Sequence, residues 1–569
     1  RQHSRRKDPP VDSIGLKILP KNHPSSFRVA LKMLNKIGGR ITVVNCSIPN
    51  IGPGMLTNRD EGTDRLQPDS KKLQPSVDFY KHLALECSTS QVAVDVFSLN
   101  NLYSDLATIA NITRFSSGHL FHYPNFNYIP TNYEKENLST MSPEELEKNL
   151  EMISTWKTTN SGWIEAERFK RDFNRYLSRK IGFDAVMRTR YTHAGFGIQL
   201  EISEDITDPY VIIQVALLYT SSKCDRRIRV HTLCLPVVHT VVDVFKGADQ
   251  GAIATLLGKM AVERCISSSL ANARESLINA VADAIKAYNT ATNNGKIGIS
   301  IMKLPSNLRL FPLYVFGLLK CPAFRNHVST SLDDRSGALE FIKCSPICQI
   351  LPYIYPRLYP IEQLYLKEDE LTLLDKMNDL DITSESNTQE TKNHSTRSES
   401  SFENTMSESS DEEEENSETK GTVSSTQTRY PFIGPMRLTS KDITQTGIYL
   451  IDQGNIVLIL VSLSVSPEIL RTFFDVDSIK EFPSYGLASA LPSFTDKKNR
   501  KHPSKKALIR ILSTIKKERA IGSAVFIMRQ DGPAHMRSRF LNSLIEDRSE
   551  SSMSYSEFLQ SIQAECKNS

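Results

Sequence analysis

Arginines stand at alternate positions in two segments of the chain. Arg188 and Arg190 are separated by one residue, and so are Arg227 and Arg229. Residues two apart on a β-strand point to the same face, so each pair would present two parallel guanidinium groups. Such groups suit a carboxylate, which each can hold through two hydrogen bonds. From the spacing alone, an ordinary polar strand face is the simpler interpretation, and carboxylate binding is the functional alternative.

A dense group of cations lies near the C-terminal end of the chain. It consists of Lys497, Lys498, Arg500, Lys501, Lys505 and Lys506. This group could contact phosphates or anionic lipid, or it could be a solvated loop that leads into a helix. The sequence leaves both open. Nucleic-acid binding would gain from aromatic residues interleaved for base stacking, and the group contains none, so nucleic acid is the weaker alternative.

The residues that could hold a metal ion do not form a complete set. Cys344 and Cys348 are spaced as C-x3-C, and His119 and His122 as H-x-x-H. Neither pair has a second pair at zinc-finger spacing, so core thiols and surface histidines are the default interpretation. The chain has nine cysteines, scattered singly, which fits reduced thiols in a cytosolic protein better than a disulfide framework.

Motifs for nucleophilic catalysis are missing. The chain has no G-x-S-x-G elbow, no P-loop and no G-x-G-x-x-G fingerprint. Asp333 and Asp334 are adjacent and therefore do not share a helix face, so capping or ion pairing is the expected role. The residues favour a protein that binds over one that catalyses.

Length and charge indicate a protein of several domains with an anionic partner. A chain of 569 residues exceeds what one core usually serves. The net charge is +4, but residues 367–420 hold 17 acidic and 5 basic residues, so the remainder carries +16. The apolar run at 456–465 is about half of the ~20 residues that a membrane helix needs. No signal peptide is expected, and the missing initiator Met suggests a fragment.

The elements that would position these residues change along the chain. Alternation of short helices and strands over 22–125 predicts a parallel sheet flanked by helices, and 165–180 predicts a basic amphipathic helix with Phe169, Phe173, Tyr176 and Leu177 on one face. Strands are expected at 183–189, 198–202, 211–219 and 227–235, the last half-buried and paired with its neighbour as a hairpin. Helical spacing predominates over 238–365.

The remaining segments differ sharply in composition. Residues 367–428 are rich in Ser, Glu, Thr and Asn and include the fully acidic run Asp411–Glu415. Such a segment cannot bury enough apolar surface to offset its ordering entropy, which predicts a disordered linker. After it, strands at 448–451 and 456–461, a helix at 507–515 and a strand at 524–528 predict a final α/β domain.

Several blocks of the chain resemble the cargo-adaptor subunit of the COPII vesicle coat, the Sec24 family, in collinear order. These blocks are 103–107, 122–126, 176–188, 218–222, 226–238, 261–288, 446–450, 544–551 and 554–559. The resemblance implies a multidomain α+β protein. Its expected parts are a partial α/β (vWA-like) trunk at 1–182 with an irregular insertion at 127–163, a β-sandwich at 183–237, an all-α helical domain at 238–366, the acidic linker at 367–428 and a gelsolin-like domain at 429–569.

The resemblance also implies a function. Such a protein pairs with a paralogous GTPase-activating coat subunit on the endoplasmic reticulum membrane and binds cytosolic signals of cargo and SNAREs. The outer coat and a small GTPase would be indirect partners, and the anionic membrane surface a direct one. Arg188 and Arg190 match the family's Met-Arg-x-Arg element, which helps to receive acidic signals. Basic nucleic-acid binding and actin binding stay as alternatives.

The chain departs from the family pattern in three places. The four-cysteine zinc finger and the first half of the trunk are missing, so no cofactor is expected. The segment between Tyr191 and Gly195 is much shorter than in the family, which affects the part of the sandwich next to Arg188 and Arg190. The acidic insert at 367–420 is not typical of the family. Either a partial gene model or a degenerate paralogue fits these departures.

Overall fold

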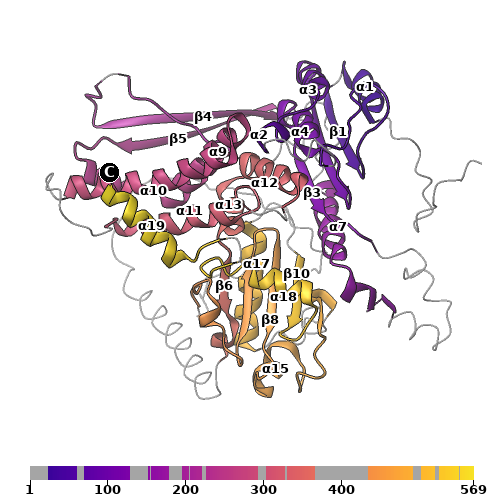
Figure 1. Cartoon of the computed structure of the whole chain (residues 1–569), viewed down its shortest axis with the longest axis vertical. Coiled ribbons are helices and arrows are strands. Elements are labelled where there is room, and N and C mark those ends of the chain that lie inside the picture. Colours follow the sequence, from indigo (N-terminus) through magenta and orange to yellow (C-terminus); the bar gives the residue numbers. More distant parts are fainter. Residues whose placement is uncertain are drawn as a thin grey trace, which may run out of the picture.

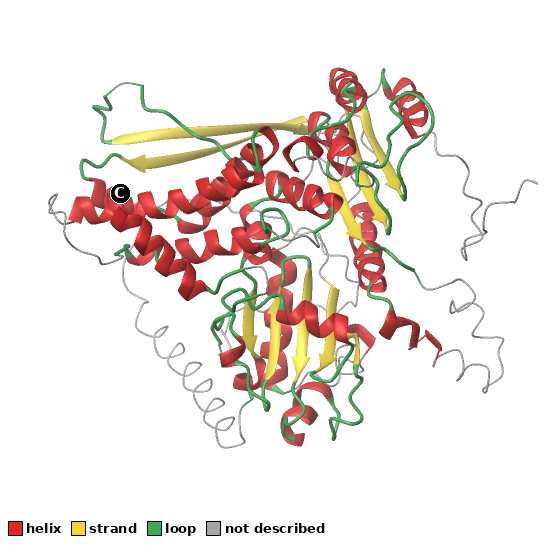
Figure 2. Cartoon of the chain, viewed as in Figure 1, coloured by secondary structure: helices red, strands yellow, loops and turns green. Residues whose placement is uncertain are grey.

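The computed structural model describes three folded regions, each with its own elements (Figure 1). In it, the N-terminal region lies beside a helical region, and the C-terminal region packs below both in the view of Figure 2. The residues described are 23–36, 38–60, 69–128, 152–153, 155–178, 195–203, 205–220, 226–292, 303–326, 330–365, 433–490, 502–518, 524–549 and 552–568.

The N-terminal region is built on a parallel sheet of three strands in the order β1-β2-β3. β2 is buried along almost its whole length, which explains its nearly continuous apolar sequence. The alternation of helices and strands predicted for 22–125 is confirmed. The strands are β1 (Gly39–Asn45), β2 (Val92–Asn100) and β3 (Leu120–Pro124), and the helices are α1 (His23–Leu34), α2 (Asp69–Lys72), α3 (Phe79–Thr89), α4 (Leu106–Phe115) and α7 (Gly162–Ser178).

Helix α7 forms as its amphipathic pattern predicts. Phe169, Phe173 and Tyr176 pack against Phe97 of β2, with ring centroids 5.2–5.9 Å apart. Leu177 was expected on the same face, but it is 58% exposed, because it points about 100° around the helix from Tyr176. The insertion predicted as irregular is helical at 155–159, and most of its other residues lie outside the described ranges.

Of the expected β-sandwich, the structure describes a single hairpin, β4 (Tyr210–Thr220) paired antiparallel with β5 (Arg226–Pro236). The predicted pairing is confirmed. The prediction that β5 is half-buried is wrong, since every residue of it is exposed and no further described strand covers it. Residues 198–202 are described but do not form the predicted strand, and 183–189 lie outside the described residues.

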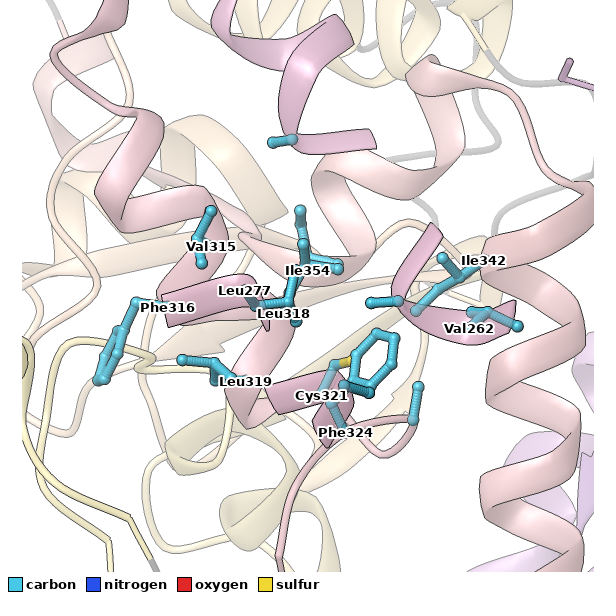
Figure 3. Close-up of a cluster of buried hydrophobic side chains, with 14 of the residues drawn as sticks. Val262, Leu277, Val315, Phe316, Leu318, Leu319, Cys321, Phe324, Ile342 and Ile354 are labelled. Carbon is cyan, nitrogen blue, oxygen red and sulfur yellow. The ribbon is translucent and has the colours of Figure 1, made fainter. Parts of the chain in front are cut away.

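The helical region has a continuous apolar core. Helices α9, α10, α11 and α12 contribute buried side chains that meet around Leu318 and Phe324 (Figure 3). The C-terminal helix of the chain joins this core through Phe558 and Ile562. The helices are α8 (Val241–Gly247), α9 (Gln250–Ser267), α10 (Leu270–Thr292), η3 (Ser306–Leu308), α11 (Phe311–Lys320), α12 (Leu332–Cys344), α13 (Ile347–Ile354) and α19 (Tyr555–Asn568).

The C-terminal region is a mixed sheet of five strands in the order β6-β7-β8-β10-β9. α15 and α17 cover one face, and α18 covers the other. The predicted hairpin, helix and last strand are confirmed. The elements are β6 (Arg357–Pro360), η4 (Ile361–Leu364), η5 (Ser440–Asp442), β7 (Ile448–Asp452), β8 (Ile456–Val461), α15 (Pro467–Phe474), β9 (Tyr485–Leu487), η6 (Ala488–Ala490), α17 (Pro503–Glu518), β10 (Ala524–Arg529) and α18 (Ala534–Leu541).

Packing crosses two of the expected domain boundaries. β6 precedes residue 366, yet it pairs with β7 in the C-terminal sheet. α19 follows residue 429, yet it packs on α10 and α11 of the helical region, as the yellow helix of Figure 1 shows. In both cases an element packs on a region other than its neighbour in sequence. The local sequence pattern shows that the element has an apolar face, but it does not show which region covers that face. The predicted acidic linker lies outside the described residues.

Candidate functional site

Helix α7 connects two of the three regions. Its C-terminal half lies on the N-terminal sheet, whereas Trp163 and Ile164 at its start are buried against the C-terminal sheet. The Trp163 ring meets Phe526 of β10 edge-to-face, with centroids 5.4 Å apart. The polar residues in the middle of α7 are therefore held where the N-terminal, helical and C-terminal regions meet, a place we call the three-way junction.

A buried carboxylate links two of these regions at the three-way junction. Glu165 of α7 accepts a hydrogen bond of 2.5 Å from Arg168 on the same helix. Its other oxygen accepts two hydrogen bonds of 3.2 Å from Arg539 of α18, in the C-terminal region. Burial acts to raise the pKa of Glu165, but the two guanidinium groups outweigh it and lower that pKa. Glu165 is therefore an ionised, doubly paired contact between regions.

A second carboxylate is less well satisfied. Asp172, about two turns further along α7 than Glu165, accepts a hydrogen bond of 3.0 Å from the Tyr123 hydroxyl, while its Oδ1 is buried without a hydrogen-bond partner among the described residues. Arg168 lies 3.6 Å away. Burial nevertheless raises the pKa of Asp172 to about 7, and it lowers the pKa of the nearby His122 to about 4. His122 is therefore uncharged near neutral pH, whereas Asp172 changes its protonation state near pH 7.

Glu165, Arg168, Asp172 and His122 line a cavity of about 460 Å³ at the three-way junction. β3 and α7 form one wall, α11, α12 and α13 a second, and the β7–β8 turn with α18 a third. Gly337 allows α12 to lie this close to β3, because a Cβ atom there would stand 2.5 Å from His122 Nδ1. The cavity can accept a small polar group.

The cavity lacks the features of a nucleophilic active site among its described residues. Burial raises the pKa of the Cys321 thiol to about 11, so the thiol stays protonated. The Ser543 hydroxyl donates to the backbone oxygen of Arg539, not to a base. A nucleophile needs an adjacent base to be activated, and no such pair lines the cavity within the described residues.

A different carboxylate ties the helical region to the N-terminal region. Asp333 at the start of α12 accepts from the backbone N–H groups of Ser104, at 2.6 Å, and Leu106, at 2.8 Å. It therefore satisfies the N–H of Leu106, the first residue of α4, whose N-cap residue is Asp105, and it does so from a segment distant in sequence. Burial raises the pKa of Asp333 to about 6 in spite of these hydrogen bonds. The expectation for this acidic pair was capping or ion pairing, and Asp333 acts as an acceptor for the first N–H of α4 without being the N-cap residue of that helix.

The block at 544–551 connects the C-terminal and helical regions. Lys320 of α11 donates to the backbone oxygens of Ile545 and Asp547, at 2.8 and 2.5 Å. Glu546 accepts from the Tyr355 hydroxyl at 2.8 Å, and Asp547 accepts from the Thr439 hydroxyl at 2.7 Å. Sequence reasoning singled out this block only through a family resemblance, because nothing in its spacing shows which distant groups its acids will meet.

Most of the residues predicted from sequence to bind ligands cannot be placed. Arg188, Arg190, Lys497, Lys498, Arg500 and Lys501 lie outside the described residues. Lys505 is described and does not fit an anionic surface contact: it is 2% exposed and donates to Asp475 at 2.7 Å. Lys505 cannot contact an anionic surface because it lies on the buried side of α17. Lys506 is exposed, as predicted, and Arg227 and Arg229 are exposed on β5.

The candidate metal ligands do not converge. Within the described residues, no group of three or more His, Cys, Asp and Glu could hold a metal ion. Cys344 instead donates to Glu340 at 3.4 Å, and His119 is buried beside Phe121. The cluster that does form, around His122, Arg168 and Asp172, was missed because its members come from separate elements. The sequence contains one indication of this cluster, which is that polar residues interrupt the aromatic side of α7.

Comparison with known proteins gives the family of the chain. The chain matches the Sec23/Sec24 trunk domain over 22–150, the Sec23/Sec24 beta-sandwich domain over 178–238 and the Sec23/Sec24 helical domain over 249–352. The chain belongs to the Sec23/Sec24 family. It is 32% identical to protein transport protein Sec24B of Homo sapiens and 28% identical to sec24 of Schizosaccharomyces pombe, each over 95% of its length.

The match to solved structures concerns the fold. The chain superposes on the human COPII-coat protein Sec24c with a TM-score of 0.62 at 18% identity, covering 95% of this chain and 63% of that one. It spans 38% of human Sec24B and 52% of the fission yeast relative, so it corresponds to about half or less of these proteins. Among the described residues, no helix is both long and apolar enough to cross a bilayer.

Proposed function

We propose that this chain selects cargo in the inner layer of the COPII coat during transport from the endoplasmic reticulum to the Golgi. The observation that carries the proposal is the collinear match of three Sec23/Sec24 domains, together with about 30% identity to Sec24 proteins over 95% of the chain. The buried contacts between regions support it, because an adaptor must hold its binding surfaces in a defined arrangement.

The proposed partners follow from this role. They are a paralogous GTPase-activating coat subunit in a heterodimer, the cytosolic tails of membrane cargo and SNAREs, and the anionic surface of the endoplasmic reticulum. The outer coat and the small GTPase would be reached through the paralogous subunit. The chain would act in the cytoplasm and peripherally at exit sites and vesicles, and we propose that it binds without catalysing a reaction and without zinc.

Affinity purification tests the proposal most directly. The full chain, tagged and expressed in cells, is expected to recover the paralogous coat subunit in near-stoichiometric amount. Recovery of RNA or of actin without that subunit would favour one of the two alternative functions and overturn the proposal. Elemental analysis of the purified chain after dialysis tests the zinc expectation, which stoichiometric zinc would contradict.

Cargo recognition is proposed to involve Arg188 and Arg190. Two guanidinium groups on one face of a strand offer charge-assisted hydrogen bonds to the carboxylates of an acidic signal. Titration of an acidic tail peptide against the full chain is expected to show roughly a tenfold loss for the Arg188→Ala/Arg190→Ala variant, which corresponds to about 1.4 kcal/mol. The matched control is Arg227→Ala/Arg229→Ala, the other alternating pair. Equal affinities for all three proteins would refute the assignment.

A further inference from the structure

One face of α12 lines the cavity at the three-way junction. Asp334, Gly337, Ala338 and Phe341 all belong to the lining, and positions three, four and seven residues apart lie on the same side of a helix. At a rise of about 1.5 Å per residue, the first and last of these positions are roughly 10 Å apart along the axis. The face therefore has an anionic end and an aromatic end, with only a glycine and an alanine between them.

The carboxylate of Asp334 has no hydrogen bond or ion pair with a described residue. Only its backbone N–H is engaged, which donates to the Ser331 hydroxyl at 3.0 Å. Burial lowers the pKa of His122, and the negative charge of Asp334 opposes that lowering, so the two side chains lie close together. The His122 imidazole likewise has no partner among the described residues. The cavity thus offers an anionic acceptor and a neutral one that the described chain does not use.

A second carboxylate of the lining also lacks a donor. Asp172 is 5% exposed, and its Oδ1 has no hydrogen-bond partner among the described residues. A buried acceptor without a partner is costly in a folded protein, so such a group indicates a missing donor. An ammonium group can supply it, because it carries three N–H donors and no acceptor.

Aromatic rings form the other end of the cavity. Phe341 of α12 and Tyr353 of α13 both line it, and their ring centroids are 4.8 Å apart. Both side chains are partly exposed. The face of an aromatic ring attracts a cation through its quadrupole, and it also packs well against a short carbon chain. Such rings beside a carboxylate without a partner suit an organic cation.

Most cations of the lining are already engaged. Arg168 and Arg539 share the buried carboxylate near the start of α7, and Lys320 donates to two backbone oxygens. Arg325 differs, because it donates to the Thr330 hydroxyl at 2.6 Å and forms no ion pair with a described residue. Its charge makes a small anion the alternative occupant, which the experiment below includes.

We propose that the cavity binds a small organic amine, with its ammonium group at Asp334 and its carbon chain along Phe341 and Tyr353. The volume of about 460 Å³ is within the range of small-molecule sites. Asp172 supplies a second negative charge, and the uncharged His122 supplies an acceptor nitrogen. Because the N-terminal and helical regions both contribute to the site, a bound amine stabilises their association. This inference does not depend on the proposed coat function.

Three probes with the same carbon chain test the ligand class. They are n-butylammonium, the neutral 1-butanol and the anion butyrate, each titrated against the full chain and followed by ligand-detected NMR. We expect n-butylammonium to bind at least about tenfold more tightly than the other two, because only it can pair with a carboxylate. Equal or tighter binding of butyrate would assign the cavity to Arg325 and an anion, and would overturn the proposal. Absence of saturable n-butylammonium binding up to roughly 30 mM would overturn it as well.

Asp334→Asn separates this site from general attraction to a charged protein. The variant should lose at least about fivefold in affinity for n-butylammonium, because the charge-assisted contact is replaced by a neutral one. Asp283→Asn, at an exposed position of α10, is the matched control and should bind like wild type. Thermal unfolding without ligand checks that both variants are folded. Equal affinities for the two variants would overturn the proposal.

The pH dependence of binding tests Asp172. Burial raises its pKa to about 7, whereas an amine stays protonated up to about pH 10 and favours the ionised carboxylate. Affinity should therefore fall about tenfold from pH 8 to pH 6. The titratable and charged groups that face Asp172 are Arg168, Glu165, Arg175, Tyr123 and His122. Asp172→Asn should remove most of the fall, and an equally steep fall in that variant would overturn the role of Asp172 in binding.

Discussion

Charged residues at the three-way junction and on α17 differ in where their partners are. At the junction, Glu165 is buried and holds Arg168 and Arg539 within hydrogen-bonding distance, so three charges are fixed in one geometry. On α17, Lys506 and Lys517 are exposed, and neither forms an ion pair with a described residue, since the adjacent Glu518 is paired with Arg357. Buried charges that lose a partner are costly, whereas exposed charges remain solvated. Charge therefore holds the regions together at the junction and stays available to a partner on α17.

The largest effect is expected at the junction from Glu165→Gln. The substitution leaves Arg539 and Arg168 without their shared carboxylate in a buried site, which should lower the free energy of unfolding by about 3 kcal/mol. Urea unfolding followed by tryptophan fluorescence measures it well, because Trp163 is buried at this junction. Glu167→Gln, on a half-buried position of the same helix, is the control and should change stability by less than about 0.5 kcal/mol. Equal effects would mean that the junction charges are not coupled.

Removal of the Asp333 carboxylate, which accepts from the first N–H of α4, should have the next largest effect. Asp333→Ala leaves the buried N–H groups of Ser104 and Leu106 without an acceptor, at a cost of about 2 kcal/mol. The adjacent Asp334→Ala is the matched control, with an expected change below about 0.5 kcal/mol. Hydrogen exchange should localise the loss to α4. Unchanged protection there would contradict this role of Asp333.

The pH dependence of stability tests Asp172. The pKa of Asp172 is about 7 in the folded protein and about 3.8 in the unfolded chain, so the folded protein binds a proton that the unfolded chain has already lost. The stability that this proton binding contributes is lost as the pH rises through about 7. Between about pH 5.5 and pH 7 the loss should be about 1.5 kcal/mol. His122, with its lowered pKa, has the opposite sign, and Glu165, Arg168 and Tyr123 also face Asp172.

The difference between wild type and Asp172→Asn isolates this carboxylate from those neighbours. Because the variant cannot ionise, its stability should rise relative to wild type over the same pH interval. Parallel curves for the two proteins would show that Asp172 does not titrate in the folded protein between these two pH values.

The smallest effect comes from neighbouring lysines of α17. Lys505→Ala removes a buried ion pair with Asp475 and the packing of its aliphatic chain, which should lower the free energy of unfolding by about 1 kcal/mol. Lys506→Ala should change it by less than about 0.5 kcal/mol, because that side chain is exposed. Thermal unfolding of the two variants side by side is the measurement. A larger loss of stability for Lys506→Ala than for Lys505→Ala would contradict the conclusion that Lys505 stabilises the fold and Lys506 does not.

Local pattern was sufficient for most elements of the fold. The apolar run of β2 was predicted because a strand buried on both faces carries apolar residues at successive positions. The aromatic face of α7 was predicted because burial on a helix repeats with a fixed period. The hairpin β4–β5 was also predicted, but its burial was not. Period two shows which residues share a face, and it does not show whether another layer covers that face.

The candidate site was much less predictable than the fold. Lys505 and Lys506 stand side by side in one cationic run, yet only the orientation of α17 places the first against Asp475 and the second outside. Asp333 and Asp334 likewise look equivalent in sequence, and only the packing of α12 on α4 gives Asp333 its backbone partners. Roles of this kind depend on contacts between distant segments.

The sequence by itself determined the order of helices and strands, the uneven charge of the chain and its resemblance to a coat family, since these depend on composition and on residues close in the chain. Tertiary structure decided which regions exchange elements: β6 joins the C-terminal sheet, and α19 joins the helical core. It also decided which charges are buried, because the pKa and the energy of an ionisable group depend on the partners and the solvent that folding places around it.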